Sequence, residues 1–464
     1  MTQSPRLVRA LGWCALFLGA AATPFILFAW LEGAPREAEG FLATALGGVF
    51  AGGVTLAGTA GTARPATASA SLRLALLLWL AAPLLAAPPL MAASGDIMTG
   101  LFESYSALTT TGAVLYGPEE LSRAGVLWRC LLAWLGGLGS LVLAVTVFAA
   151  LEDPGTGLRR TSLLTIERAD LFTNFGPALR RLGAAYLVVT AAGLVLLAVT
   201  GADAFEALCL ALSGMSTAGL APQSGPLAGW LPPGAIFVLA LLCVLGAWNF
   251  AAFYEILVRH RARSASGELR AMALITAAIA AVAGLAAGTG AILPAGLDAV
   301  FAITTSGYQA TQHFVLPVPV LIFLALIGGS AVSTTGGLKL TRVLILMRRA
   351  WGEVTLLAHP SAAVRSRYGG RTLTDTAFAS VAVYALAYPV ALGAGAVLLA
   401  ATGTGFEDAW RAAGAAIANA GPLAGAAYET MPPAGLAIAI LLMVIGRLEI
   451  LAAFAALGVI FAGD

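Results

Sequence analysis

The sequence predicts an all-α integral membrane protein with ten transmembrane helices, eight of which form four repeats after an initial pair. Three observations lead to this fold class. The 464-residue chain is 59% hydrophobic and only 10% charged, with a mean hydropathy of +0.91. A soluble domain carries about 25% charged residues, so this chain has too few to cover a water-facing surface. The apolar residues also gather in long runs, and short helix-like segments that end in glycine recur between the later runs.

Ten apolar runs are long enough to cross a bilayer as helices. They cover residues 9–31, 40–60, 72–92, 125–150, 178–200, 234–258, 270–292, 315–348, 376–401 and 433–461. The first pair falls in residues 1–66, and the other spans pair into repeats over 67–165, 166–264, 265–365 and 366–464. Repetition of one unit along a chain predicts an architecture assembled from copies of that unit.

The arginines lie mainly in alternate loops. Arg159, Arg160 and Arg168 share one such loop, whereas residues 201–233 and 293–319 contain no lysine or arginine. Cytoplasmic loops of membrane proteins carry the excess of Lys and Arg, so we expect both termini in the cytoplasm. The net charge of only +2 gives no indication of nucleic-acid binding, and the lipid bilayer is the expected surrounding.

Four connections on the outer side share one design. Each begins with an acidic residue beside an aromatic or apolar one, continues as a short apolar stretch, and ends in small residues around a glycine; they cover 101–112, 204–219, 297–307 and 406–421. An apolar helix of about 10–14 residues is too short to span a bilayer, so it enters and returns. Non-helical backbone at that depth must be buried in protein or line water. The pattern therefore predicts four re-entrant pore helices, each followed by a loop.

Four such loops around one axis would direct their carbonyl oxygens inward, where these can replace the hydration shell of a small cation. The predicted selectivity filter consists of Thr110, Thr111, Gly112, Thr217, Ala218, Gly219, Thr305, Ser306, Gly307, Asn419, Ala420 and Gly421. Its four glycines would allow positive φ and close backbone approach. The acidic residues Glu103, Glu206, Asp298, Glu407 and Asp408 are expected at the helix N-termini, where they could also attract cations.

With these motifs the chain resembles the bacterial TrkH/KtrB family of potassium-uptake subunits, which also includes the plant high-affinity K⁺/Na⁺ transporters. The resemblance covers nearly the whole chain, and its markers lie in 102–113, 134–139, 328–339, 419–422 and 445–449. Ten spans, with two before the repeats, look like the TrkH branch. Glycine in all four loops goes with K⁺ selectivity in this family. The loops are unequal, however, with Thr-Thr-Gly in the first and Asn-Ala-Gly in the fourth.

The resemblance implies potassium uptake across the bacterial inner membrane by a homodimer. It also implies a cytoplasmic regulatory partner of the TrkA type, which would bind the nucleotide, ATP/ADP or NAD(H). No cofactor is expected in this chain, and K⁺ is expected only as the transported ion at the filter.

The span 315–348 is too long for one straight crossing and contains two glycine pairs, which weaken a helix. The predicted gate loop consists of Gly328, Gly329, Ser333, Thr334, Thr335, Gly336, Gly337 and Lys339. A charge inside the bilayer normally faces a cavity or a partner, and by resemblance Arg447 would sit below the filter and hold this loop. A structural arginine paired with carbonyls is the alternative. Lys339 could instead be an ordinary snorkelling residue, and Arg129 is expected to be an interfacial anchor.

Other classes remain open at this point. Sodium conduction and Na⁺- or H⁺-coupled K⁺ transport would use the same fold. A secondary transporter of another class also contains broken helices, although its repeats would be inverted. An intramembrane enzyme is not expected, because the spans contain neither an HExxH motif nor a paired aspartate motif.

Overall fold

The computed structural model describes residues 5–59, 68–151, 171–250, 266–361, 367–368, 371–372 and 375–450. Within these ranges the regular structure is helical, apart from one hairpin that pairs β1 (Arg367–Tyr368) with β2 (Arg371–Thr372). The predicted boundary between the first pair of spans and the repeats, at 66–67, lies outside the described residues, as do the three predicted boundaries between repeats, at 165–166, 264–265 and 365–366. So do Arg159, Arg160 and Arg168, on which the predicted orientation partly depends.

Six described helices are long and apolar enough to cross a membrane, and a bent pair of helices adds a seventh if the pair is counted as one span. The six are α1 (Pro5–Leu31), α2 (Pro35–Gly58), α6 (Arg123–Leu151), α7 (Leu171–Val199), α11 (Ser266–Ala287) and α15 (Asp375–Ala401). The pair is α3 (Ala68–Ala86) and α4 (Pro88–Ser94), bent by 46°. Adjacent Pro88 and Pro89 account for the bend, because proline lacks the N–H that would continue the helix.

The other three predicted spans correspond to shorter helices. They are α9 (Pro233–Ala247), α13 (Val318–Ile327) and α17 (Pro433–Arg447). The predicted spans 234–258 and 433–461 both run on into residues that lie outside the described ranges. The span 315–348 is divided in two: α13 ends at Ile327, α14 (Leu340–Ala358) begins at Leu340, and the backbone between them is irregular.

Four helices of 12 residues each lie between the longer ones. They are α5 (Ile97–Leu108), α8 (Ala204–Met215), α12 (Ile292–Ile303) and α16 (Phe406–Ile417). At 1.5 Å per residue such a helix is about 18 Å long, well short of the hydrocarbon core. Their equal lengths match the four short helices that the sequence predicts.

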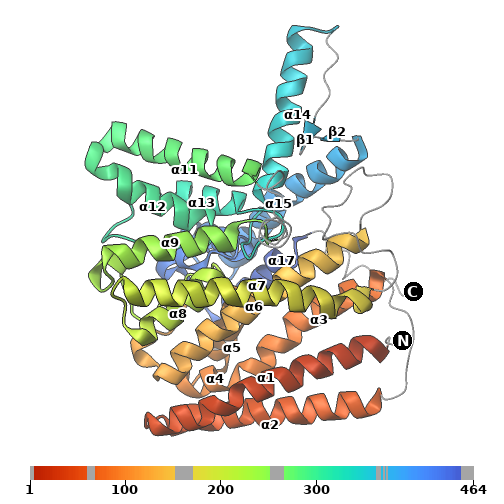
Figure 1. Ribbon diagram of the computed structural model, residues 1–464, viewed down its shortest axis with the longest axis vertical. Coiled ribbons are helices and arrows are strands. Elements are labelled where there is room, and N and C mark those ends of the chain that lie inside the picture. The colour runs from red at the N-terminus through yellow and green to blue at the C-terminus, as the bar shows by residue number, and fades with distance from the viewer. Residues whose placement is uncertain are drawn as a thin grey trace.

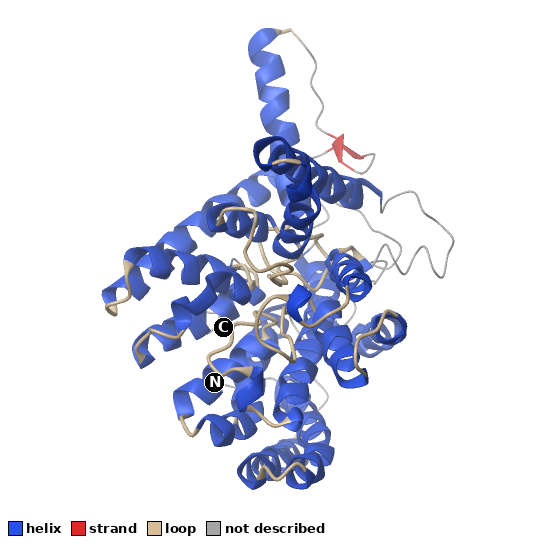
Figure 2. Ribbon diagram, turned by 90° about the vertical axis from the view of Figure 1, so that its left-hand side faces the viewer, coloured by secondary structure: helices blue, strands red, loops and turns tan. Residues whose placement is uncertain are grey.

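The first two helices pack side by side along one edge of the molecule (Figure 1). Glycines permit this close approach: a Cβ on Gly48 would lie 2.5 Å from the carbonyl oxygen of Ala15. Small residues at helix contacts are typical of membrane proteins, where lipid offers no hydrophobic drive to association. Across the rest of the molecule the helices surround a central region of irregular backbone (Figure 2).

Candidate functional site

Each short helix ends in the same backbone conformation. Two residues after its last helical residue comes a left-handed residue: Thr110 (φ 56°), Thr217 (φ 56°), Thr305 (φ 58°) and Asn419 (φ 50°). In all four, the N–H of this residue donates to the carbonyl three positions earlier. Positive φ is a genuine outlier for a β-branched residue and costs roughly 1–2 kcal/mol. The same strained position in every repeat indicates a built site rather than four ordinary turns.

The four loops form a closed ring. A Cβ on Gly112 of the first loop would lie 1.6 Å from the carbonyl oxygen of Ala218 in the second. A Cβ on Gly219 would lie 1.8 Å from the carbonyl oxygen of Ser306 in the third. The circuit closes through the fourth loop: Gly307 faces Pro422 and Leu423, while Gly421 faces Ala113 and donates its N–H to the carbonyl of Thr111 at 2.7 Å.

The glycines therefore act mainly by allowing close approach. Gly112, Gly219 and Gly307 also have positive φ, as the sequence predicts, but Gly421 does not. At Gly421 a Cβ would lie 2.4 Å from the backbone nitrogen of Ala113, so the neighbouring loop excludes a side chain there. The ring brings together all twelve predicted filter residues, and all of them are buried except Gly219, which is partly exposed.

The irregular segment 328–337, here called the glycine-rich segment, packs against the ends of three short helices. The hydroxyls of Thr334 and Thr217 are 3.2 Å apart, and the N–H of Gly336 donates to the hydroxyl of Thr305 at 3.3 Å. A Cβ on Gly336 would lie 2.0 Å from the carbonyl oxygen of Ala418. The segment thus touches the second, third and fourth loops at their left-handed residues or directly beside them.

Arg447, the last residue of α17, is buried against this segment. Its guanidinium donates to the carbonyl of Thr334 at 2.7 Å and to the hydroxyl of Ser140 on α6. Among the described residues no carboxylate forms an ion pair with it. Because no carboxylate neutralises it, Arg447 places a positive charge beside the glycine-rich segment and close to the ring.

Lys339 is also buried, and its ammonium group donates to the carbonyl of Thr335 within the same irregular stretch. The snorkelling alternative is therefore wrong for this residue. Beyond it, Arg342 on α14 forms an ion pair with Glu449, which follows α17. The glycine-rich segment is therefore held by Lys339, which lies just beyond it along the chain, and by Arg447 at the end of α17.

The acidic residues divide into two kinds. Glu206 belongs to a capping box with Asp203, and Glu407 and Asp408 lie in the first turn of α16, as predicted. The prediction is wrong for Glu103 and Asp298, because each is the seventh residue of its helix. The Phe-Glu pairs of the first and second repeats look alike in sequence, but α5 begins six residues before Glu103.

Both mid-helix carboxylates hold the chain as it leaves the ring. Glu103 accepts from the N–H groups of Leu115 and Tyr116 at 2.6 and 3.0 Å. Asp298 accepts from the corresponding return segment, at Val315 and Leu316, at 2.7 and 3.3 Å. Charge-assisted hydrogen bonds of this kind are stronger than neutral ones, so the two acids fix the outer limb of their loops.

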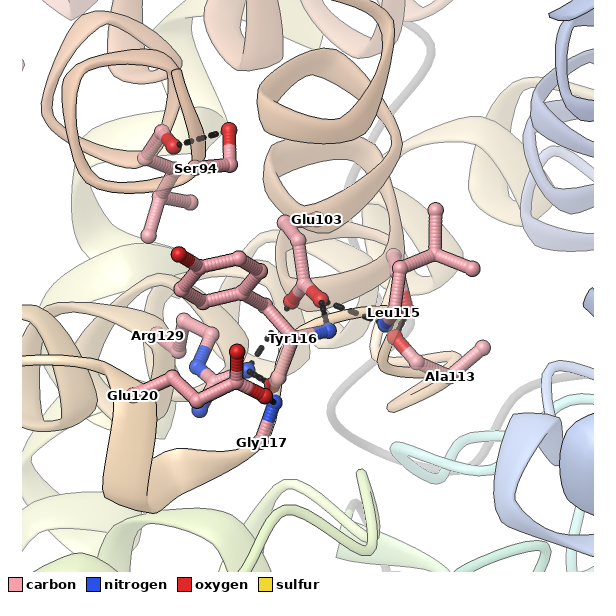
Figure 3. A network of polar contacts seen from close by, with 10 residues as sticks. Ser94, Glu103, Ala113, Leu115, Tyr116, Gly117, Glu120 and Arg129 are labelled. Atoms are coloured by element: carbon pink, nitrogen blue, oxygen red, sulfur yellow. Dashed lines mark hydrogen bonds and ion pairs between the residues drawn. The ribbon is translucent and has the colours of Figure 1, made fainter. Parts of the chain in front are cut away.

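Arg129 is not an interfacial anchor. Its side chain is 3% exposed and pairs with Glu103 at 3.1 Å, as Figure 3 shows. The same nitrogen donates to the carbonyl of Tyr116 at 3.0 Å. The partners are 26 and 13 residues away in the sequence, so no local motif could have indicated them.

The ring offers backbone carbonyls and hydroxyls, which suit a dehydrated monovalent cation. In the part of the chain that the structure describes, no three His, Cys, Asp or Glu side chains gather closely enough to hold a metal ion.

The fold and the ring define a multi-pass helical membrane protein with four loops gathered at its centre, an arrangement that suits an ion-transport protein. The family model TrkH, described as cation transport protein, matches residues 67–279 and 280–460. The chain belongs to this family.

Several curated proteins and solved structures are similar to the chain. The Trk system potassium uptake protein TrkH of Halomonas elongata is 29% identical over 398 residues, covering 81% of this chain and 82% of that protein. The protein of the same name from Vibrio parahaemolyticus is 30% identical, covering 76% and 77%. The crystal structure of the potassium transporter TrkH from Vibrio parahaemolyticus matches with a TM-score of 0.84 over 98% of both chains, at 24% identity. This last match shows that the two share a fold.

Proposed function

We propose that this chain carries potassium into the cell across the bacterial cytoplasmic membrane, with the ring of four loops as its selectivity filter. The observation that carries the proposal is the closed ring, in which each loop repeats one strained backbone turn and one glycine contact. The choice of potassium as the transported ion rests on relatives that are named as potassium uptake proteins. Carbonyl oxygens of the twelve filter residues would take the place of the water around K⁺.

The glycine-rich segment is proposed as the gate. It is buried against three of the loops, and Arg447 donates to the carbonyl of Thr334 in its middle. A segment rich in glycine can change conformation at small cost in side-chain packing. Arg447 would hold the segment in place and at the same time oppose the passage of cations.

The membrane arrangement follows from the same proposal. We place ten spans around the ring, two of them before the repeats, with both termini in the cytoplasm and the short helices entering from outside. The seven crossings by length and the three shorter helices α9, α13 and α17 support this count. The arginine distribution supports the orientation.

A homodimer and a cytoplasmic partner are part of the proposal. Helix α14 projects beyond the other helices (Figure 1) and exposes Met347, Trp351, Val354 and Leu357 to between 55% and 83%. Their spacing of three and four residues places them on one face, which suits contact with a second copy. Regulation would come from a TrkA-type subunit that binds ATP/ADP or NAD(H), since the Trk relatives are named as parts of a system. This chain itself would need no cofactor and would act as a transporter, not an enzyme.

Growth of a bacterium without its own potassium uptake tests the proposal. Expression of the full chain should restore growth at low external K⁺, and the folded Gly112→Ala variant should not. Uptake of Na⁺ in place of K⁺ would favour the sodium-conducting alternative. A requirement for a Na⁺ or proton gradient would favour the coupled carrier. Nucleotide should alter flux only when the partner subunit is present, and a nucleotide response of the purified chain alone would contradict that part.

A further inference from the structure

The first and third short helices carry an acid at the same position, but only one of the two acids has a counter-charge. Glu103 and Asp298 are both the seventh residue of their helix, and both accept two backbone N–H groups from the segment that leaves the ring. Both are buried, with 2% and 1% of their surface exposed. The two sites therefore match in position, burial and backbone contacts.

The two repeats differ at the seventh residue of the α-helix that follows each loop. Arg129 is the seventh residue of α6 and pairs with Glu103. The seventh residue of α13 is Leu324, which is buried and cannot compensate a charge. Within the described residues Oδ1 of Asp298 accordingly has no hydrogen-bond partner. The second and fourth repeats have Leu210 and Ala412 at the position of the acid and so lack this anchor altogether.

We propose that the Glu103–Arg129 ion pair positions the outer limb of the first loop and thereby sets how well the filter discriminates K⁺ from Na⁺. The proposal rests on the function proposed above and identifies two residues behind the filter as determinants of its specificity. Neither residue would contact the ion. Each would act through the backbone of residues 113–116.

The contacts show how the ion pair reaches the loop. Glu103 accepts a hydrogen bond from the N–H of Tyr116, and Arg129 donates one to the carbonyl of the same residue (Figure 3). The peptide groups on both sides of Tyr116 are therefore fixed. One turn below, the hydroxyl of Ser106 donates to the carbonyl of Ala113 at 2.6 Å. Ala113 directly follows Gly112 and lies against Gly421 of the fourth loop. A shift of the outer limb would therefore pass to the loop backbone at the junction between the first and fourth loops.

The charge is essential to this arrangement, because the pair is withdrawn from water. Replacing Glu103 by glutamine leaves one acceptor but places an amide N–H₂ against the guanidinium, and Arg129 is then a buried cation without a counter-charge. Replacing Asp298 by asparagine keeps an acceptor for the two N–H groups and directs the new amide to the side where Oδ1 has no partner. The two isosteric changes thus remove the same charge at equivalent positions with different consequences.

Bi-ionic reversal potentials of the purified full chain in planar bilayers test the proposal. We expect Glu103→Gln to lower the K⁺/Na⁺ permeability ratio about tenfold, the effect of losing one charge-assisted hydrogen bond in the filter wall. Asp298→Asn should change the ratio by less than about twofold. Arg129→Lys, which keeps the charge and a nitrogen able to contact both partners, should retain most of the wild-type ratio. Equal ratios for wild type and Glu103→Gln would overturn the inference.

Two further results separate this inference from the proposed function. A wild-type chain that does not prefer K⁺ refutes the potassium assignment itself, whereas a selective wild type with selective variants refutes only the role of the ion pair. If Glu103→Gln does not fold, the proposal is tested with the double variant Glu103→Gln/Arg129→Gln, which leaves no unpaired charge. A folded double variant with reduced selectivity supports the proposal, and one with the wild-type ratio contradicts it.

Discussion

The first and third repeats use the same backbone plan and differ in how they surround it. In each, a 12-residue helix ends before a left-handed threonine, and a mid-helix acid holds the returning segment. The first repeat adds Arg129 to its acid and presses Gly112 against a neighbouring carbonyl, whereas the third has Leu324 and a looser glycine contact. The four loops therefore share the left-handed residue but differ in the contacts that support them, and of the first and third loops the first is the more tightly constrained.

The largest expected effect comes from the glycines. A Cβ at position 112 would lie 1.6 Å from the carbonyl oxygen of Ala218, with no flexible group to yield. At position 307 the nearest atoms are side-chain carbons of Leu423 and Pro422, at 3.2 Å. Gly112→Ala should lower K⁺ flux by about 100-fold or more, and Gly307→Ala by about tenfold, from the left-handed strain alone. Tracer uptake into liposomes measures both; equal losses would remove the difference between the loops.

The ion pair should appear in stability as well as in selectivity. Glu103→Gln leaves Arg129 buried and unpaired and is expected to lower the free energy of unfolding by about 3 kcal/mol. Asp298→Asn should cost less than about 1 kcal/mol, because no cation is left unpaired. Thermal unfolding of the detergent-solubilised variants compares the two. A larger loss for Asp298→Asn would show that the third repeat depends more on its acid.

Arg447 links the two repeats, since it bonds to Ser140 in the first and to Thr334 in the third. Its loss should free the glycine-rich segment and remove a positive charge, so Arg447→Ala is expected to raise K⁺ flux about tenfold. The matched control is Ser140→Ala, which removes only the bond to the first repeat and should leave the segment held. Unchanged or lower flux in folded Arg447→Ala protein would indicate a purely structural arginine.

The smallest effect concerns the pH dependence of a contact at the surface of the protein. The hydroxyl and N–H of Ser224 donate to the carboxylate of Glu119, which joins the connections after the first and second loops. The hydroxyl bond is the main cause that lowers the pKa of Glu119. A lowered folded pKa means that this stabilisation is complete at neutral pH and is lost as pH falls through the folded value. The link between the second and third connections uses backbone bonds from Leu227 and Ala228 and does not titrate.

Thermal unfolding between neutral pH and about pH 3.5 measures this contribution. Wild type should lose slightly more stability on acidification than Glu119→Gln, whose amide does not titrate. Since Glu119 is exposed, the difference should be small and should shrink at high salt. Identical acid profiles for the two proteins would show that the carboxylate contributes nothing to the link.

Much of this arrangement could be predicted from the sequence, because hydropathy and glycine position are local. The long spans, the four loops and the break after Ile327 all follow from runs of apolar residues and the glycines that interrupt them. The supports could not be predicted in the same way. The start of α5 depends on Asp96, whose carboxylate accepts from Thr99 and caps the helix. The more conspicuous Phe102–Glu103 pair led to the wrong prediction that Glu103 lies at the start of the helix.

Partners far apart in the sequence account for the other errors. Arg129 lies near the start of a span, which favours an interfacial anchor until the position of Glu103 is known. Lys339 follows a helix break, where a snorkelling lysine is common, but its backbone is left-handed and turns the side chain back to Thr335. In both cases the three-dimensional path of the chain, rather than residue type, determines the contact.

The reversal potential of the wild-type full chain, with K⁺ on one side of a planar bilayer and Na⁺ on the other, tests the central claim most directly. A filter made by the four-loop ring predicts a potential set by K⁺, and a shift toward zero when Gly112 is replaced by alanine. A potential near zero in the wild type, or one that is unchanged in that variant, would contradict the account.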